Sequence, residues 1–320
     1  MSDIVIRTHK LRKVYRTGFL RKKRIGLAGL DMEVRRGEVL GYIGPNGAGK
    51  TTTIKLLLGL NFPTSGSAEV LGQPLGAIEP RARIGYLPER PYFYDYLTAE
   101  EFLHFYGQLH GMDVAQRNRR IDELLPLVQM EHARKLQLRK FSKGMLQRVG
   151  VAQALINEPE LVVLDEPSSG LDPMGRVLIR DAILSLRKKG TTVLLSSHIL
   201  SDVESVADRV AIITEGELRK LGTTAELIGN TLRCVEVTFE GLNESGLASL
   251  GEATVVMEGP RTTTVALPSH DAASHAVRQG MQAGAHLVSV VPQRQTLENL
   301  FVEQVTSHAL PPVAAPEEPL

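Results

Sequence analysis

Apolar and polar positions in the first two thirds of the chain alternate between short strand-like runs and longer helical repeats. Strands are expected at 4–15, 28–34, 39–43, 68–71, 84–87, 161–164, 192–198, 210–213 and 217–221, with 4–15 at a sheet edge. Val39–Ile43 and Leu161–Leu164 contain no charged residue. Continuous apolar runs of this length are typical of parallel strands that are buried on both faces. The pattern therefore predicts an α/β domain over residues 1–230.

A helical stretch interrupts this strand-rich pattern at about residues 97–157. It opens on Thr98–Glu101, a capping box that begins a helix. A second helix is expected over Val114–Met130, with Pro126 kinking or ending it. A third begins after Phe141–Met145. These helices predict a compact helical subdomain inside the α/β domain, too short for a long coiled coil.

From residue 231 onward the pattern starts again with a different order of elements. Strands and helices are expected as β-α-β-β-α-β between 233 and 291, which is the ferredoxin-like order. An amphipathic helix over 296–306 closes this part. The sequence thus predicts a small α+β ferredoxin-like accessory domain at 231–306. Residues 307–320 are rich in Pro, Ala and Glu and are expected to form a disordered tail.

Bulk composition narrows the classes of function. A length of 320 residues is enough for two domains. The formal net charge of +1 lacks the basic footprint of a nucleic-acid binder. The single cysteine, Cys234, excludes an internal disulfide and indicates a reducing compartment. The N-terminal residues do not resemble a signal peptide, and no apolar run reaches membrane-spanning length. If the protein serves a membrane process, we expect another chain to supply the membrane part.

A glycine-rich segment after the strand 39–43 fits the phosphate-loop pattern of Gly, four residues, Gly-Lys-Thr. The segment consists of Gly44, Pro45, Asn46, Gly47, Ala48, Gly49, Lys50, Thr51 and Thr52. Backbone N–H groups of such a loop surround phosphate oxygens, and the following helix points its positive end at the same anion. We expect Lys50 to reach the β and γ phosphates and Thr51 to ligate Mg²⁺. The alternative is a turn that only starts a helix, and the strand before the segment argues against it.

Acidic and imidazole groups follow two of the buried strands. Asp165 and Glu166 come directly after Leu161–Leu164, and His198 ends the run 192–198. Ligands of open α/β sheets bind at the carboxyl ends of the strands. We expect Asp165 to hold Mg²⁺, directly or through water, and Glu166 to take a proton from an attacking water. Acids at a strand end are common and a lone histidine is usually structural, so the phosphate loop upstream is what makes these residues candidates.

Three further features each have two interpretations. Tyr15 either packs within its strand or offers an aromatic face on which adenine stacks. The basic run Arg21–Arg24 is either a solvated hairpin tip or a contact for lipid headgroups. The aromatic cluster at 91–96 is either a small satellite core or a surface for a partner, because aromatic residues are enriched at interface centres.

Six motifs follow one another along the chain in the same order as in a known family. They resemble those of the nucleotide-binding subunit of an ATP-binding cassette (ABC) transporter. Gly44–Thr51 resembles the Walker A motif, and Leu161–Glu166 resembles the Walker B motif. The others are Phe141–Met145 for the signature Leu-Ser-Gly-Gly-Gln, Asp172 for the D-loop, His198 for the switch histidine and Tyr15 for the adenine-stacking aromatic. The resemblance covers about residues 4–225. The C-terminal part resembles the extra domain of bacterial exporter ATPases of the sodium-export, drug-resistance and gliding type.

The resemblance implies an ATPase whose nucleotide sites are shared between two copies. In the family, the Walker A motif of one cassette faces the signature of another, so Ser142, Lys143, Gly144 and Asp172 are implied as contacts at a site shared with a partner copy. Lys143 and Met145 depart from the family signature, while Ser142 and Gly144 are kept. A helix begins there and aims its N-terminus at an anion, and Lys143 adds positive charge. We therefore expect a working site.

Glu89 takes the place of the Gln in the family's Q-loop, a change that the exporter subgroup shares. In the family this loop reaches toward Mg²⁺ and the γ-phosphate on one side and the permease on the other. The resemblance thus implies Glu89 as a contact for nucleotide and metal, with Lys50, Glu166 and His198 as the catalytic residues. It also implies ATP and Mg²⁺ as ligands, a homodimer and a separate integral-membrane permease. The implied location is cytoplasmic, on the inner face of the cell membrane, with no nucleic acid bound.

Two other hypotheses stay open from the sequence alone. A soluble ABC ATPase could act on ribosomes or nucleic acid, although such members carry two cassettes or long coiled coils. A nonenzymatic nucleotide-gated scaffold would have degenerate catalytic groups, whereas Glu166 and His198 are both present. The leading hypothesis is the energy subunit of an ABC exporter.

Overall fold

The computed structural model describes residues 3–17, 22–229 and 232–306. The chain divides into two compact units, residues 1–227 with 301–320 and residues 228–300. The expected tail at 307–320 and part of the basic hairpin run lie outside the described residues. None of the described helices is long and apolar enough to cross a membrane.

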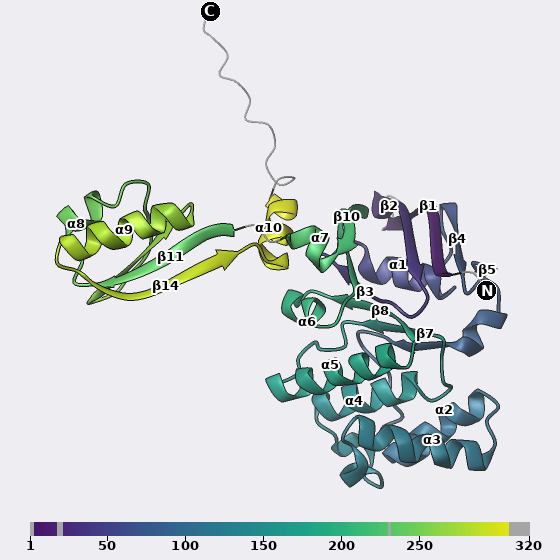
Figure 1. Cartoon of the computed structure of the whole chain (residues 1–320). Helices are drawn as coiled ribbons and strands as arrows, with labels where there is room; N and C mark the ends of the chain where they lie inside the picture. The colour runs from purple at the N-terminus through teal and green to yellow at the C-terminus, as the bar shows by residue number, and fades with distance from the viewer. Residues whose placement is uncertain (1–2, 18–21, 230–231, 307–320) are drawn as a thin grey trace, which may run out of the picture. The chain divides into compact units, whose positions relative to one another are not determined.

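The first unit is built on a ten-stranded sheet with the order β5-β4-β1-β2-β10-β9-β3-β8-β7-β6 (Figure 1). Its strands are β1 (Ile4–Thr17), β2 (Lys22–Arg35), β3 (Val39–Ile43), β4 (Ser65–Val70), β5 (Gln73–Pro74), β6 (Ile84–Leu87), β7 (Leu161–Asp165), β8 (Thr192–Ser197), β9 (Arg209–Thr214) and β10 (Glu217–Thr223). Strands β6, β7, β8, β3 and β9 pair in parallel. Every residue of β3, β7 and β8 is buried, which confirms the prediction of buried parallel strands.

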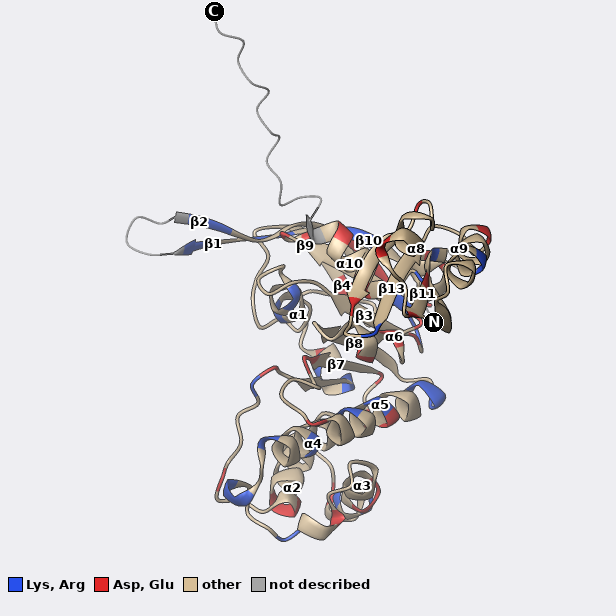
Figure 2. Ribbon diagram, turned by 90° about the vertical axis from the view of Figure 1, so that its left-hand side faces the viewer, with Lys and Arg blue, Asp and Glu red and all other residues tan. Residues whose placement is uncertain are grey.

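The expectation that the first strand lies at a sheet edge is wrong. Strand β1 pairs with β2 on one side and with β4 on the other. The following β5 then forms the sheet edge. Val5, Ile6 and Leu11 of β1 are fully buried in the core of this unit. Figure 2 shows the far ends of β1 and β2 running out from the sheet as a two-stranded ribbon.

Helices cover the sheet and form an insertion between β6 and β7. The helices of this unit are α1 (Lys50–Leu57), α2 (Ala99–Leu109), α3 (Val114–Leu127), α4 (Lys143–Ala154), α5 (Pro173–Lys188), α6 (Leu200–Glu204) and α7 (Thr224–Ile228). The predicted capping box is confirmed, because Thr98 N donates to Glu101 Oε2 at 2.8 Å and Glu101 N donates to Thr98 Oγ1 at 3.2 Å. Helix α3 ends one residue after Pro126, short of the expected Met130.

The aromatic cluster divides between packing and exposure. Phe93 packs on Phe102 of α2, with ring centroids 5.3 Å apart, and Tyr94 packs edge-on against Phe105 at 5.3 Å. Tyr92 is 80% exposed. The cluster is therefore a satellite core with an exposed aromatic rim, and a partner surface at this rim stays a prediction.

The second unit is a four-stranded antiparallel sheet with two helices. Its elements in chain order are β11 (Leu232–Glu240), α8 (Glu244–Ala248), β12 (Thr254–Glu258), β13 (Thr262–Leu267), α9 (His270–Gln282) and β14 (His286–Arg294). The sheet order is β12-β13-β11-β14. Val235, Val237 and Phe239 of β11 are fully buried in a core shared with α9. A Cβ atom on Gly280 would lie 2.6 Å from the Phe239 ring, so that helix position requires glycine. A further helix, α10, spans Leu297–Thr306.

Candidate nucleotide site

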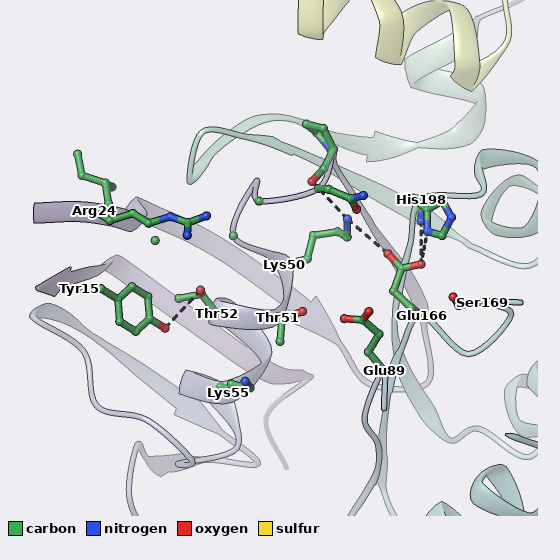
Figure 3. A pocket seen from close by; sticks show the side chains of 16 residues that line it. Tyr15, Arg24, Lys50, Thr51, Thr52, Lys55, Glu89, Glu166, Ser169 and His198 are labelled. Carbon is green, nitrogen blue, oxygen red and sulfur yellow. Dashed lines mark hydrogen bonds and ion pairs between the residues drawn. The ribbon is translucent and has the colours of Figure 1, made fainter. Parts of the chain in front are cut away.

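A cavity of the first unit opens where parallel strands end. Its volume is about 760 Å³. The residues that line it are Tyr15, Arg24, Ile25, Gly26, Pro45, Asn46, Gly47, Gly49, Lys50, Thr51, Thr52, Lys55, Glu89, Glu166, Ser169 and His198 (Figure 3). The phosphate loop follows β3, and segments after β6, β7 and β8 supply Glu89, Glu166 and His198. Four parallel strands thus deliver their carboxyl ends to one site, as expected of an open α/β sheet.

The phosphate loop bends sharply between β3 and α1, and its glycines are required by the geometry. Gly49, the N-cap of α1, has a φ of 110°, a conformation that is strained for other residues. A Cβ atom there would also lie 2.5 Å from the backbone oxygen of Gly26. Gly44 and Ala48, predicted with the loop, belong to it but do not line the cavity. The cavity therefore meets the N-terminus of α1, where free N–H groups and the helix dipole favour an anion.

Lys50 lies buried at the first turn of α1 with its ammonium group fully engaged. Its Nζ atom donates to Gly44 O at 2.6 Å and to Pro45 O at 3.4 Å. The same atom lies 3.4 Å from Glu166 Oε1. Only 7% of the side chain is exposed, so these contacts compensate for the loss of water around the charge. These contacts hold the positively charged Lys50 side chain beside the phosphate loop.

Glu166 is held from three sides at the end of β7. Its φ is 54°, a left-handed conformation that costs a non-glycine residue of the order of 1 kcal/mol. Its backbone N–H donates to Ser196 O and Oγ, both at 3.1 Å. Its Oε2 atom accepts from the His198 backbone N–H at 3.2 Å and lies 2.5 Å from His198 Nδ1. The strained backbone therefore aims a nearly buried carboxylate into the cavity, with its side chain oriented by the residue after β8.

Asp165 lies beneath the cavity rather than on its wall. Its Oδ1 atom accepts a hydrogen bond from Ser196 Oγ at 2.5 Å, while its buried Oδ2 atom has no hydrogen-bond partner among the described residues. Burial raises the pKa of Asp165 above its ordinary value, and the hydrogen bond from Ser196 acts in the opposite direction. A buried oxygen without a partner, next to a hydroxyl, fits a hard cation that prefers oxygen ligands.

Glu89 adds an exposed carboxylate to the same cavity. It follows β6 and lines the wall with Thr51 and Glu166 (Figure 3). No three His, Cys, Asp or Glu side chains gather into a metal-binding cluster in the described ranges.

The opposite end of the cavity is aromatic. The Tyr15 ring passes across Gly26, where a Cβ atom would lie 2.5 Å from the ring. The Tyr15 hydroxyl accepts from Asn61 Nδ2 at 3.1 Å and lies 3.4 Å from Thr52 Oγ1. Lys13 Nζ lies 5.3 Å from the ring centroid. Contacts to the helix of the phosphate loop thus fix the orientation of this ring.

The signature and D-loop residues do not join this cavity. Ser142 is the N-cap of α4, and its Oγ atom accepts from Met145 N at 3.2 Å. Asp172 caps α5, accepting from Gly175 N at 2.8 Å. Lys143 lies over Gly170, where a Cβ atom would overlap its ammonium group. None of these residues, nor Gly144, lines the wall with Lys50. One copy of the chain therefore does not bring the two groups of residues together.

Three residues of the site were missed by sequence reasoning. Ser196 supports both acids; its only signal in the sequence is its place as the last residue but one of a buried strand, whereas its position opposite Asp165 comes from the register of β7 and β8. Ser169 follows Glu166 by three residues and lines the cavity. Arg24 was expected at a solvated hairpin tip or at lipid headgroups, yet it lines the cavity and pairs with Tyr15 across the hairpin.

The fold and the cavity together define a P-loop nucleotide-hydrolase site: a phosphate loop, a buried lysine, two acids and an oriented histidine at the ends of parallel strands. The sequence pattern of the ABC transporter family matches residues 27–169. The chain is 43% identical over 318 residues to an uncharacterized ABC transporter ATP-binding protein of Synechocystis, covering 96% of this chain and 86% of that one. The chain therefore belongs to the ATP-binding proteins of ABC transporters, and it is an ATPase subunit.

Further relatives and solved structures agree. The linearmycin resistance ATP-binding protein of Bacillus subtilis is 32% identical over 292 residues, covering 88% of this chain and 93% of that protein. The bacitracin transport ATP-binding protein of Bacillus licheniformis is 46% identical over 192 residues, 59% of this chain and 62% of that protein. A solved ATP-binding subunit of an ABC transporter superposes with a TM-score of 0.62 at 33% identity, covering 70% of this chain and 91% of that one.

Proposed function

We propose that this ATPase subunit drives export through a separate integral-membrane permease, from a position on the inner face of the cell membrane. The observation that carries this proposal is the similarity to export and resistance proteins. The linearmycin resistance protein is similar over nearly its whole length. The Nod factor export ATP-binding protein of Cupriavidus pinatubonensis is 38% identical over 231 residues, 70% of this chain and 71% of that one. Similarity of this extent supports a shared type of transport.

Membrane recruitment tests this proposal. The chain should sediment with membranes when a multi-span membrane protein encoded beside it is co-expressed, and remain in the supernatant without it. Co-purification with ribosomes or DNA at physiological salt would instead favour the soluble ABC ATPase. A chain that sediments equally well with and without the membrane protein would contradict recruitment by a permease.

The contacts in the cavity support a division of roles among its residues. We infer that the adenine stacks on Tyr15, that the phosphate loop and Lys50 hold the phosphates, and that Glu166 takes a proton from the attacking water. His198 orients Glu166, because both its backbone N–H and its ring nitrogen meet Glu166 Oε2. Catalysis of phosphoryl transfer rests mainly on positioning and electrostatics, which suits a carboxylate held this firmly.

We infer that Thr51, Asp165 and Glu89 would hold Mg²⁺. The unpartnered oxygen of Asp165 and the neighbouring Thr51 hydroxyl support this assignment. When bound, the ion would neutralise negative charge on the phosphate oxygens.

We further propose that two copies share their ATP sites. Ser142, Lys143, Gly144 and Asp172 lie outside the cavity of their own chain. Helix α4 begins directly after its N-cap Ser142, and the first N–H groups of a helix have no partner within the helix. A dimer in which each signature faces the partner's phosphate loop would bring these groups to a nucleotide. The fold itself is also that of a solved dimeric cassette, with a TM-score of 0.63 at 23% identity.

The domain division is likewise proposed: a cassette at 1–230 with a helical subdomain near 97–157, and a ferredoxin-like accessory domain at 231–306. The antiparallel order of the second sheet and its separate core support it. A fragment that ends near residue 230 should remain folded and bind ATP within about threefold of the full chain, because a domain with its own core can fold alone. Circular dichroism would report the fold and a nucleotide titration the affinity. A folded fragment that no longer binds ATP would show that the division is misplaced.

A further inference from the structure

The Arg24 side chain is a cation that none of the recognised motifs assigns, and it reaches the phosphate loop. It lines the same cavity as Tyr15 and Lys50. A Cβ atom on Gly47 would lie 3.8 Å from its guanidinium nitrogen Nη2. Figure 3 shows the side chain extending from β2 toward the loop. The Arg24 side chain makes no hydrogen bond or ion pair with any other residue in the described part of the chain, so its guanidinium donors are available for a ligand.

The register of the hairpin explains why Arg24 faces the cavity. Tyr15 pairs with Arg24, and Arg16 pairs with Lys23 in the adjacent position. Because successive residues of a strand point to opposite faces, the pair Tyr15 and Arg24 shares one face of the ribbon. Arg16 and Lys23 carry the same charge but do not line the cavity. Arg24 is therefore distinguished by position rather than by charge alone.

The position of Arg24 along the cavity indicates which part of a nucleotide it meets. Tyr15 lies at the aromatic end, and Lys50 lies 3.4 Å from Glu166 at the reacting end. Arg24 approaches Gly47 from the same hairpin that carries Tyr15. A nucleotide whose base stacks on Tyr15 and whose last phosphate lies near Glu166 would pass its sugar and inner phosphates beside Arg24.

We propose that Arg24 is an additional nucleotide-binding residue that donates to the inner phosphates, α or β, from the same chain. This inference rests on the proposed role of Tyr15 in orienting the nucleotide. A guanidinium presents several donors in a planar fork that matches phosphate oxygens. Since ADP and ATP share the inner phosphates, Arg24 raises the affinity for both and does not discriminate between them. The contact is distant from Glu166, so it contributes to binding and not to the chemical step.

Titration of Arg24→Ala with fluorescent ADP and with a non-hydrolysable ATP analogue tests the inference. We expect both dissociation constants to rise about tenfold, which is about 1.4 kcal/mol each. The KM for ATP should rise by a similar factor while kcat stays within about twofold, because only ground-state binding is lost. Arg24→Lys should lie between wild type and Arg24→Ala. The effect should shrink at high salt, because an exposed charge is screened.

Lys23→Ala is the matched control, since it removes one charge from the adjacent position on the other face of the ribbon. It should bind both nucleotides within about twofold of wild type, because more distant exposed charges contribute little. Equal losses in Lys23→Ala and Arg24→Ala would overturn a local contact. Wild-type affinity in Arg24→Ala, or a loss confined to the ATP analogue, would also overturn the inference while leaving the proposed function intact. A wild-type chain that binds neither nucleotide would contradict the proposed function itself.

Discussion

Glu166→Gln is expected to lower ATP turnover by about 10²–10⁴-fold, the range for loss of a general base, while nucleotide affinity stays near that of wild type. Glutamine keeps the shape of the side chain and can still accept the hydrogen bond from the His198 backbone N–H. It cannot take a proton from water. The side chain is only 9% exposed and contacts Lys50 as well as His198, so the substitution removes basicity from a site whose geometry is otherwise retained.

Glu89→Gln is the matched control for this prediction. Glu89 is a second carboxylate on the wall of the same cavity, yet it is exposed, whereas Glu166 is held by both Lys50 and His198. Its substitution should keep turnover within about tenfold of wild type, or about 1.4 kcal/mol of barrier. A steady-state phosphate-release assay measures both variants. Normal turnover in Glu166→Gln would reject its role as the base, and equal inactivity of the two variants would reject the division of roles between them.

A mixture of Lys50→Ala chains with Ser142→Arg chains should regain ATPase activity that each variant lacks alone. In a symmetric dimer with shared sites, one site of the mixed pair carries both defects and the other carries neither. Random pairing then restores at most about a quarter of wild-type activity if the sites act independently. The prediction rests on geometry, because Ser142 does not line the cavity that contains Lys50 of its own chain.

Two differently tagged Lys50→Ala preparations provide the control for mixing. They can exchange partners but cannot form an intact site, so they should stay inactive. Pull-down through one tag establishes that mixed dimers form in each mixture. Were mixed dimers of Lys50→Ala and Ser142→Arg present but no more active than the separate variants, the shared-site arrangement would be rejected.

The parts of the site that sequence predicted are those in which chemistry follows directly on a buried strand. The phosphate loop after β3, Glu166 after β7 and His198 after β8 all meet in one cavity. The carboxyl ends of adjacent parallel strands lie at the same edge of the sheet. Recognising a segment as a parallel strand is therefore enough to place the residues that follow it in a shared site. The buried strands β3, β7 and β8 were predicted closely because continuous apolar runs are typical of parallel strands.

Features that depend on pairing between distant segments were not predictable from local pattern. The prediction that β1 lies at the sheet edge was wrong because no pattern near residues 4–15 indicates that β4 pairs with it. Arg24 was grouped with its basic neighbours because only the register with Tyr15 separates it from them. The hydrogen bond to Asp165 Oδ1 comes from Ser196, which is 31 residues away in sequence. For Arg24 and Ser196, a one-residue change of register would turn the side chain to the other face of the sheet.

We expect this chain to bind and hydrolyse ATP as one of a pair of cassettes. Light scattering of Glu166→Gln measures this most directly, because the variant should bind ATP without consuming it. With ATP and Mg²⁺ the mass should be twice that of the 35.0 kDa chain, and with ADP it should be that of the single chain. A single-chain mass in both nucleotides, with ATP shown to be bound, would contradict the claim.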